Sequence, residues 1–227
     1  MKGFNMSELW KNGDYVKRYN NVYGISGEQM DRYLAPLNLA PDDRAVEFGC
    51  GNGDALARVA DIAAAAVGVD ISKEQLENAR LKLEGRKNIL LVESSFLDCR
   101  GKLGGHSFTK GLSRKALHHL TDPEKKIFVE KTAQLFKKDS IFVLEDGIFN
   151  FDRAELNEKV PEIVAEAKIY YGAAWPQVEK DFMITILEEF VTDYKTWEAA
   201  FNHGGFMMTS RKAYSMFYGM MVFKKIG

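Results

Sequence analysis

Cysteine and long apolar runs are both scarce in this sequence of 227 residues. The two cysteines, Cys50 and Cys99, are too few for a disulfide framework or for a cysteine-based metal site. No run approaches the roughly 18 consecutive apolar residues of a membrane-spanning helix, and the first residues lack the apolar stretch of a secretory signal peptide. We therefore expect a soluble, cytoplasmic protein that does not use a membrane as a partner.

An excess of charge of either sign is also absent, because 31 Lys and Arg residues are balanced by 32 Asp and Glu residues. The net charge of −1 offers no basic surface for a phosphate backbone, so nucleic acid is not an expected partner. Hydrophobic residues make up 46% of the chain, which is enough for a full core at this length. The expected partner is a small molecule, bound by a monomer or a homodimer.

Strand-like and helix-like patterns alternate in the middle of the chain. Capping boxes, such as Ser72-x-x-Gln75 and Thr121-x-x-Glu124, begin two of the helices. This alternation predicts an α/β fold with a doubly wound, mostly parallel sheet and helices on both faces. Two further strands, at 206–210 and 214–223, are expected to form an antiparallel pair at the sheet edge. The five parallel strands are predicted at 44–48, 64–70, 88–92, 108–113 and 140–144.

The chain is predicted to form one domain from four segments. Residues 1–40 are expected to form a helical lid or cap, and residues 41–150 the cofactor-binding α/β core. Residues 151–191 are an inserted helical segment that builds a substrate pocket, with a helix over 153–171 that Pro161 interrupts. Residues 192–227 complete the core with a helix that Thr192 caps and with the strand pair.

Three tyrosines in the first segment, Tyr15, Tyr19 and Tyr23, are spaced to share one helical face. Such a stripe is typical of a surface helix that packs on the domain. The other interpretation is a lid over a cofactor.

A glycine-rich turn follows the first predicted strand and directly precedes a helix. Glycines at positions 49, 51 and 53 allow a ligand to approach the backbone closely. Their G-x-G-x-G spacing differs from the G-x-G-x-x-G of dinucleotide-binding proteins, and the carboxylate of Glu47 would repel a pyrophosphate. A carboxylate at this place favours a cationic or amine-bearing ligand, and Asp70, which ends the second strand, suits a ribose.

Residues 46–53 and 67–72, with the stretch 113–123 after the fourth strand, resemble the class I S-adenosylmethionine-dependent methyltransferases of the small-molecule branch. The resemblance implies a seven-stranded Rossmann-like methyltransferase fold and S-adenosylmethionine (SAM) as the cofactor. It places Glu47 near the amino-acid part of SAM and Asp70 on the ribose hydroxyls. The expected cofactor-binding residues are Glu47, Gly49, Cys50, Gly51, Asp70, Ile71, Ser95, Phe96, Ser113 and Tyr19.

Two positions depart from the pattern of that family. Ser95 stands where an acidic residue usually contacts the adenine amine, and the fourth strand opens without its usual acidic residue. A serine hydroxyl, the carboxylate of Asp98 or a backbone carbonyl is expected to accept the adenine hydrogen bond instead. The second departure is expected to change the local packing and to leave the site intact.

His118 and His119 are the candidate catalytic residues. Histidine titrates near neutral pH, and a general base is needed if the acceptor carries a proton. The alternative is that one of the two packs under the following loop. No metal site is expected, because the fourth strand ends in Ser113-Arg114, where metal-dependent relatives keep an acidic residue.

Four residues are expected to line the substrate pocket, namely Asp146, Tyr170, Tyr171 and Trp175. Core packing of the inserted segment explains the aromatic ones equally well. The predicted function is methyl transfer from SAM to a small-molecule acceptor by in-line displacement. A non-catalytic SAM-binding protein that regulates or binds a partner is the alternative, and the glycine spacing disfavours a nicotinamide-dependent oxidoreductase.

Overall fold

An eight-stranded sheet forms the centre of the structure, a computed structural model that describes Trp10 and residues 12–227. Five parallel strands stand in the order β3-β2-β1-β4-β5, followed by β8 and then β7. β8 is antiparallel to both β5 and β7, so the predicted mostly parallel sheet with an antiparallel C-terminal pair is confirmed. The bounds are β1 (Arg44–Phe48), β2 (Ala65–Asp70), β3 (Ile89–Glu93), β4 (Phe108–Arg114), β5 (Phe136–Phe149), β7 (Phe206–Ala213) and β8 (Tyr218–Lys225).

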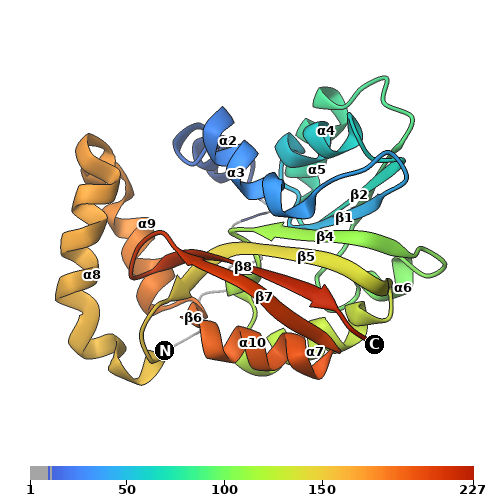
Figure 1. Ribbon diagram of the computed structural model, residues 1–227. Helices are drawn as coiled ribbons and strands as arrows, with labels where there is room; N and C mark the ends of the chain where they lie inside the picture. The colour runs from blue at the N-terminus through green and yellow to red at the C-terminus, as the bar shows by residue number, and fades with distance from the viewer. Residues whose placement is uncertain (1–9, 11) are drawn as a thin grey trace.

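Helices cover both faces of the sheet (Figure 1). α3 (Gly27–Leu34), α4 (Asp54–Ala60) and α5 (Lys73–Lys82) lie on one face, and α6 (Cys99–Lys102), α7 (Asp122–Ala133) and α10 (Tyr194–His203) on the other. Alternate residues of β1 separate the two cores, since Ala45 packs with α4 and α5 whereas Val46 packs with α7 and α10. Burial on both faces explains why the parallel strands are nearly continuous apolar runs.

The predicted capping residues begin their helices. Ser72 accepts a hydrogen bond from the N–H of Gln75 at the start of α5. Thr121 and Glu124 form a complete capping box at the start of α7, with Pro123 in its first turn. These local signals set the helix starts because they satisfy N–H groups that have no partner within the helix.

Two predicted details of the second half are wrong. The helix over 153–171 is not interrupted, because α8 (Leu156–Tyr171) continues through Pro161. Packing of its buried residue Ile163 in one apolar cluster with α9 (Trp175–Leu187) offsets the hydrogen bond that proline cannot donate. Thr192 is not a helix cap either. It lies in the two-residue strand β6 (Thr192–Asp193) beside the end of β5, and Asp193 caps α10.

Helices from the first and the second half of the chain gather beyond the carboxyl ends of the parallel strands. α8 and α9 project there, at the left of Figure 1, and α2 (Gly13–Val22) lies near the same end. Arg18 of α2 forms an ion pair with Asp181 of α9, which ties the two together. The part of the predicted lid at 1–9 and 11 lies outside the described residues.

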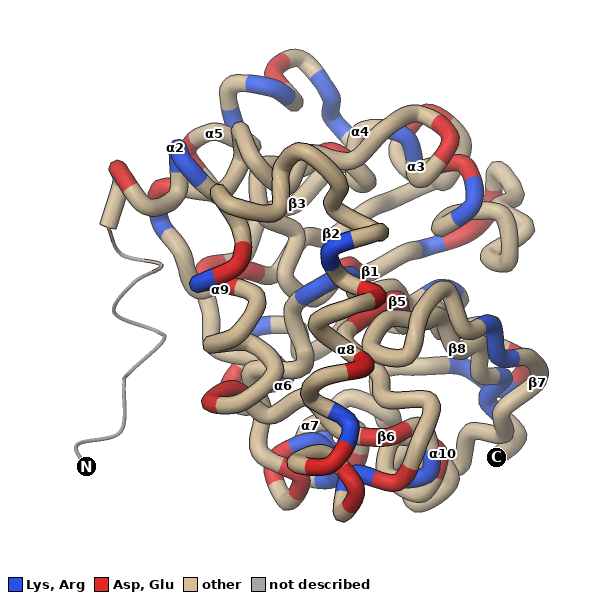
Figure 2. Tube along the Cα trace, turned by 90° about the vertical axis from the view of Figure 1, so that its left-hand side faces the viewer, with Lys and Arg blue, Asp and Glu red and all other residues tan. Residues whose placement is uncertain are grey.

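Seen from this end, basic and acidic residues are interspersed along the trace (Figure 2). This distribution agrees with the net charge of −1. Among the described residues, no helix is both long and apolar enough to cross a membrane.

Candidate functional site

A cavity of about 1020 Å³ opens at the carboxyl ends of the parallel strands, and we refer to it as the large cavity. Its walls come from the ends of β1, β2 and β4, from the segment after β3, and from α2. Open α/β sheets bind their ligands in this crevice, where the strand order reverses on either side of β1. Of the predicted site residues, the cavity brings together Tyr19, Glu47, Gly49, Cys50, Gly51, Asp70, Ile71, Ser95, Phe96 and His119.

The turn after β1 is built for close approach to the backbone. Gly49 has a φ of +76°, and a Cβ at this residue would lie 2.3 Å from the Cβ of Ala116. Gly51 has a φ of +50°, a region that side chains disfavour. Cys50 is buried between them, and burial raises the pKa of its thiol well above the usual value, so that it serves as a packing group.

Asp70 ends β2 at the floor of the large cavity. Its Oδ2 accepts a hydrogen bond from the N–H of Gly51 at 2.8 Å, and its Oδ1 accepts one from the N–H of Ser72 at 2.9 Å. Burial raises the pKa of Asp70, and these backbone hydrogen bonds oppose that rise. Each carboxylate oxygen keeps a further lone pair, so Asp70 can still accept hydrogen bonds from two ligand hydroxyls.

Glu47 is a buried acidic residue of the cavity wall. It is only 4% exposed, and its Oε2 has no hydrogen-bond partner among the described residues. Burial, together with the charge of Asp70, raises the pKa of Glu47 well above its usual range. A buried carboxyl oxygen without a partner costs free energy, and a bound cationic amine would remove that cost.

The segment after β3 supplies apolar and hydroxyl groups. Phe96 lines the cavity, and so does Ile71, whose side chain is 37% exposed and free to contact a flat ring. The Ser95 hydroxyl is used within its own turn, where it donates to Asp98 at 2.6 Å. Ser94, which the sequence interpretation missed, is 6% exposed, lines the cavity, and has no partner for its hydroxyl among the described residues.

The aromatic face of α2 closes one side of the large cavity. Trp10, Tyr19 and Tyr23 all line it, and the ring centroid of Tyr19 lies 4.8 Å from that of Trp10 and 4.9 Å from that of Tyr23. The amides of Asn20 and Gln75 exchange hydrogen bonds at 3.0 and 3.1 Å, which joins α2 to α5. The tyrosines therefore share a face, as predicted, and that face points to the cavity.

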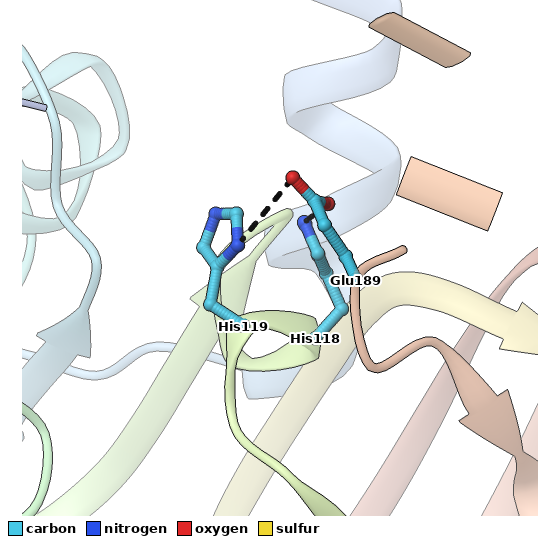
Figure 3. A group of neighbouring side chains, drawn as sticks. All are labelled: His118, His119 and Glu189. Atoms are coloured by element: carbon cyan, nitrogen blue, oxygen red, sulfur yellow. Dashed lines mark ion pairs between the residues drawn. The ribbon is translucent and has the colours of Figure 1, made fainter. Parts of the chain in front are cut away.

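The turn after β4 carries a network of charged side chains (Figure 3). His118 Nδ1 lies 2.5 Å from Asp146 Oδ1, and His118 Nε2 lies 3.2 Å from Glu189 Oε2. His119 Nδ1 lies 3.8 Å from the other oxygen of Glu189 and has no hydrogen-bond partner among the described residues. Asp146 also accepts hydrogen bonds from the N–H groups of Leu117 and His118, so it fixes the turn from below.

This network shifts the pKa values of the two histidines in opposite directions. Burial by itself would lower the pKa of His118, but the charge and hydrogen bond of Asp146, with Glu189, outweigh it and raise that pKa to about 10. Burial and the neighbouring His118 lower the pKa of His119 to about 4. At neutral pH His118 is therefore an imidazolium and His119 a neutral imidazole.

His118, His119 and Glu189 offer ligand atoms within 4.8 Å of one another, a spacing that suits a metal ion. Asp146 and Glu189 flank His118 and pair with its two ring nitrogens. The structure gives these residues the arrangement of an ion-pair network. Glu189 was missed in the sequence because it follows α9, far along the chain from both histidines.

A small cavity of about 100 Å³ adjoins the large one, and His119 and Lys115 line both. The predicted residues Tyr170 and Tyr171 line the small cavity, as does His118. Half of the residues that line it are aromatic, and Trp10 and Tyr19 are among them. A ring-shaped ligand would find a complementary surface there.

Three predicted site residues do not reach either cavity. Trp175 is buried in the apolar cluster between α8 and α9. Asp146 is fully buried beneath the turn that it holds, so it positions His118 and does not line a substrate pocket. Ser113 is also fully buried, and its hydroxyl donates to the carbonyl of Phe48 at 2.8 Å.

Of Ser113 and Arg114, which the sequence interpretation placed together at the amino-acid end of the cofactor, only Arg114 reaches the large cavity, and Lys115 joins it there. Arg114 lines the large cavity and donates from Nε to Glu145 at 3.0 Å. Tyr218 donates to the same oxygen of Glu145 at 2.8 Å. Lys115 has a φ of +50°, which costs a non-glycine residue about 1–2 kcal/mol. A strained residue at the mouth of two cavities points to a functional requirement.

Comparison with known sequences places the chain among methyltransferases. A family model described as "Methyltransferase domain" matches residues 45–139. An uncharacterized methyltransferase of Geobacillus sp. is 31% identical over 147 residues, which are 65% of this chain and 67% of that protein. Another, from Oceanobacillus iheyensis, is 24% identical over 141 residues, or 62% of each chain. The chain thus spans about two thirds of the length of these curated relatives.

Solved structures share the fold at low identity. A magnesium protoporphyrin IX methyltransferase from Synechocystis, solved with bound SAH, is 13% identical with a TM-score of 0.67, over 97% of this chain and 98% of that one. A cyclopropane synthase from Mycobacterium tuberculosis is 13% identical with a TM-score of 0.67, over 93% of this chain and 78% of that one. Such likeness establishes the arrangement of the sheet and its helices.

Proposed function

Because the chain belongs to the S-adenosylmethionine-dependent methyltransferase family, we propose that it transfers a methyl group from SAM to a small-molecule acceptor. When bound, SAM supplies a methyl group on a sulfonium, whose carbon–sulfur bond breaks as the bond to the acceptor atom forms, with the electron pair left on sulfur. The protein has to align the two molecules and exclude water between them.

The pair of acids at the ends of β1 and β2 is the observation that carries this proposal. Glu47 has an unpartnered, buried carboxyl oxygen at the cavity wall, which fits the ammonium group of an amino acid. Asp70 has its carboxylate fixed by two backbone N–H groups with lone pairs to spare, which fits the two hydroxyls of a ribose. An amino-acid group and a ribose in one ligand are the combination that SAM presents.

The rest of the cavity wall complements the other parts of the cofactor. The backbone of Gly49 and Gly51 would pass beneath the amino-acid part, in positive-φ conformations that favour glycine. Ile71 and Phe96 would hold the adenine between apolar surfaces, and the free hydroxyl of Ser94 is the group that we assign to its polar edge. Tyr19 would cover the cofactor from α2.

On the acceptor side we assign the small cavity and the turn after β4. His119 lines both cavities and is neutral at pH 7, so it is able to accept a proton from the acceptor. His118 and Asp146 are positioning residues, because Asp146 holds the turn and His118 carries the ion pair to Glu189. Tyr170 and Tyr171 would contact the acceptor.

The small cavity also favours an enzyme over a non-catalytic SAM-binding protein, since the latter needs no space beside the methyl group. Isothermal titration of the purified protein with SAM and with S-adenosylhomocysteine (SAH) tests the proposal, and we expect micromolar dissociation constants. NADH at the same concentrations is the control ligand. Absence of binding to SAM and SAH, or tighter binding of NADH, would overturn the proposal.

An activity assay separates the enzyme from the non-catalytic alternative. The protein is incubated with SAM and a mixture of small metabolites, and SAH release is measured against a reaction without the mixture. We expect release to depend on the mixture. Tight SAM binding without any acceptor-dependent SAH release from such mixtures would favour the non-catalytic alternative.

A further inference from the structure

Lys115 is a charged residue at the junction of the two cavities that the proposed function does not use. It directly follows β4, lines both the large and the small cavity, and is held in place by its backbone N–H, which donates to the carbonyl of Glu145 at 2.9 Å. Its φ of +50° places a lysine where glycine would be less strained. A side chain kept at such a position indicates a contact that glycine cannot make.

The neighbouring acids Glu145 and Asp146 are paired with other groups, although Oε2 of Glu145 is buried without a hydrogen-bond partner among the described residues. Glu145 accepts hydrogen bonds from Arg114 and Tyr218, and Asp146 accepts from His118 and from backbone N–H groups. Within the described residues, no carboxylate lies within the 4.0 Å of an ion pair from Lys115 Nζ. The ammonium group instead lies 5.7 Å from the ring centroid of Tyr23 and 5.5 Å from that of Tyr218.

Aromatic rings thus surround a cation that has no anion in contact. Rings attract a cation more weakly than a carboxylate does, and they leave its donors without strong acceptors. Burial, with the nearby Arg114, lowers the pKa of Lys115 to about 8, which an anion placed beside it would raise again. The ammonium group of Lys115 therefore has N–H donors left for a ligand, and Lys115 lies at the junction of the two cavities, where the proposed function puts the acceptor.

The size and the lining of the small cavity limit the kind of molecule that can carry this anionic group. The small cavity measures about 100 Å³, and half of the residues that line it are aromatic. This is less than the roughly 150 Å³ of an apolar cavity that holds one benzene ring, so a ring bound there would extend through the opening into the large cavity. The small cavity opens into the large one beside Lys115 and His119, so one ring fits with a substituent at the junction.

We propose that the acceptor is an aromatic anion, a single ring that carries a carboxylate or phenolate oxygen, and that Lys115 binds this oxygen. The inference rests on the proposed function, because it assigns the acceptor of the same site. His119, on the other side of the junction, is neutral and does not compete for the anion.

Matched probes test the charge requirement on the protein saturated with SAH. Benzoate and benzamide have the same shape and differ in charge, and 4-nitrophenolate and nitrobenzene form a second pair at pH 8. We expect at least one anion to bind tenfold or more tightly than its neutral partner. Preference for benzoate identifies a carboxylate and preference for 4-nitrophenolate a phenolate. Equal affinity within both pairs, or no binding by any probe, overturns the inference.

Variants then assign the preference to Lys115. Lys115→Met keeps the length of the side chain, and Lys115→Gly removes it while it relieves the positive φ, so one of the two should fold. We expect both to lose the preference for the anion with unchanged affinity for SAH, and Lys115→Arg to keep it. Lys212→Met is the control, because Lys212 also lies over a tyrosine ring, 5.6 Å from that of Tyr214, but outside both cavities.

The two proposals fail separately. Loss of SAH binding by the unaltered protein would contradict the proposed function. Normal SAH binding with an anion preference that survives in Lys115→Met and Lys115→Gly would contradict only the role of Lys115.

Discussion

Replacing Glu47 with glutamine should stabilise the free protein and at the same time weaken its binding of SAM. Glu47 is 4% exposed, and its Oε2 has no hydrogen-bond partner among the described residues. The carboxyl group thus destabilises the protein without ligand, and a bound cationic ligand would remove this destabilisation. Glutamine keeps the size of the side chain and removes its charge.

The expected magnitudes follow from the burial of this carboxyl group. An unsatisfied buried polar group costs about 1–3 kcal/mol, and part of this cost remains with the amide. A gain of about 1–2 kcal/mol corresponds to a rise in Tm of roughly 2–8 °C for a chain of this size. Loss of a hydrogen bond between charged groups costs about 1.5–3 kcal/mol, so the affinity for SAM should fall roughly 10- to 150-fold.

The gain in stability should depend on pH in a defined direction. Burial raises the pKa of Glu47 above its ordinary value of 4.5, so the folded protein keeps a proton that the unfolded chain has released. The free energy of unfolding therefore decreases as the pH rises above 4.5 through the folded-state pKa, and glutamine removes this dependence. The advantage of Glu47→Gln should be largest at high pH and vanish near pH 4.5.

Thermal unfolding between pH 5 and 8, with isothermal titration of SAM at pH 8, measures both effects. Glu93→Gln is the matched control, because Glu93 ends the neighbouring strand β3 and is exposed. It should change neither Tm nor affinity by a comparable amount. A lower Tm for Glu47→Gln at pH 8, or an unchanged affinity for SAM, would refute the reasoning.

Two other side chains give sharp predictions. Asp70→Ala should weaken SAM binding by about 1–3 kcal/mol in a titration, since it removes hydrogen bonds to a charged acceptor, and a change of under a few tenths would exclude Asp70 as the ribose ligand. His119→Ala should lower the rate of acceptor-dependent SAH formation by about 10²-fold with little change in SAH affinity. An unchanged rate would show that His119 has no catalytic role. Burial and the nearby His118 lower the pKa of His119 from 6.5 to about 4, so the free energy of unfolding should decrease as the pH falls through this window, where the unfolded chain alone takes up the proton. Denaturant titrations at pH 7 and 4.5 should show a smaller decrease for His119→Ala.

The sheet could be predicted because its signals are local. The strands β1, β2 and β3 are short, mostly apolar runs, and the helix starts at Ser72 and Thr121 carry their own capping residues. β6 had no such signal, since its two residues form a strand only through pairing with Ile148 and Phe149 at the end of β5. The predicted interruption of the helix at Pro161 was wrong for the opposite reason. Proline is a strong local signal for a helix break, but packing of α8 with α9 outweighs it.

The signals for the proposed cofactor side of the site are almost as local in the sequence as those for the sheet. Glu47, Gly49 and Gly51 lie within one stretch, and Asp70 joins them because β2 pairs beside β1. Ser113 was misplaced by one strand position. It pairs with Phe48 of β1 and is fully buried, with its hydroxyl bound to the carbonyl of Phe48, so the side chains that reach the large cavity are those of the next two residues, Arg114 and Lys115.

The proposed acceptor side is assembled from distant segments, and this explains why the sequence indicates the cofactor more readily than the acceptor. His118 and His119 follow β4, Asp146 lies in β5, and Glu189 follows α9, so no single stretch records their contacts. The protonation of the histidines depends on those contacts, since Asp146 and Glu189 together keep His118 charged and leave His119 neutral. A change in the 151–191 insertion can therefore alter the acceptor side while the turn at 47–51 and its cofactor stay the same.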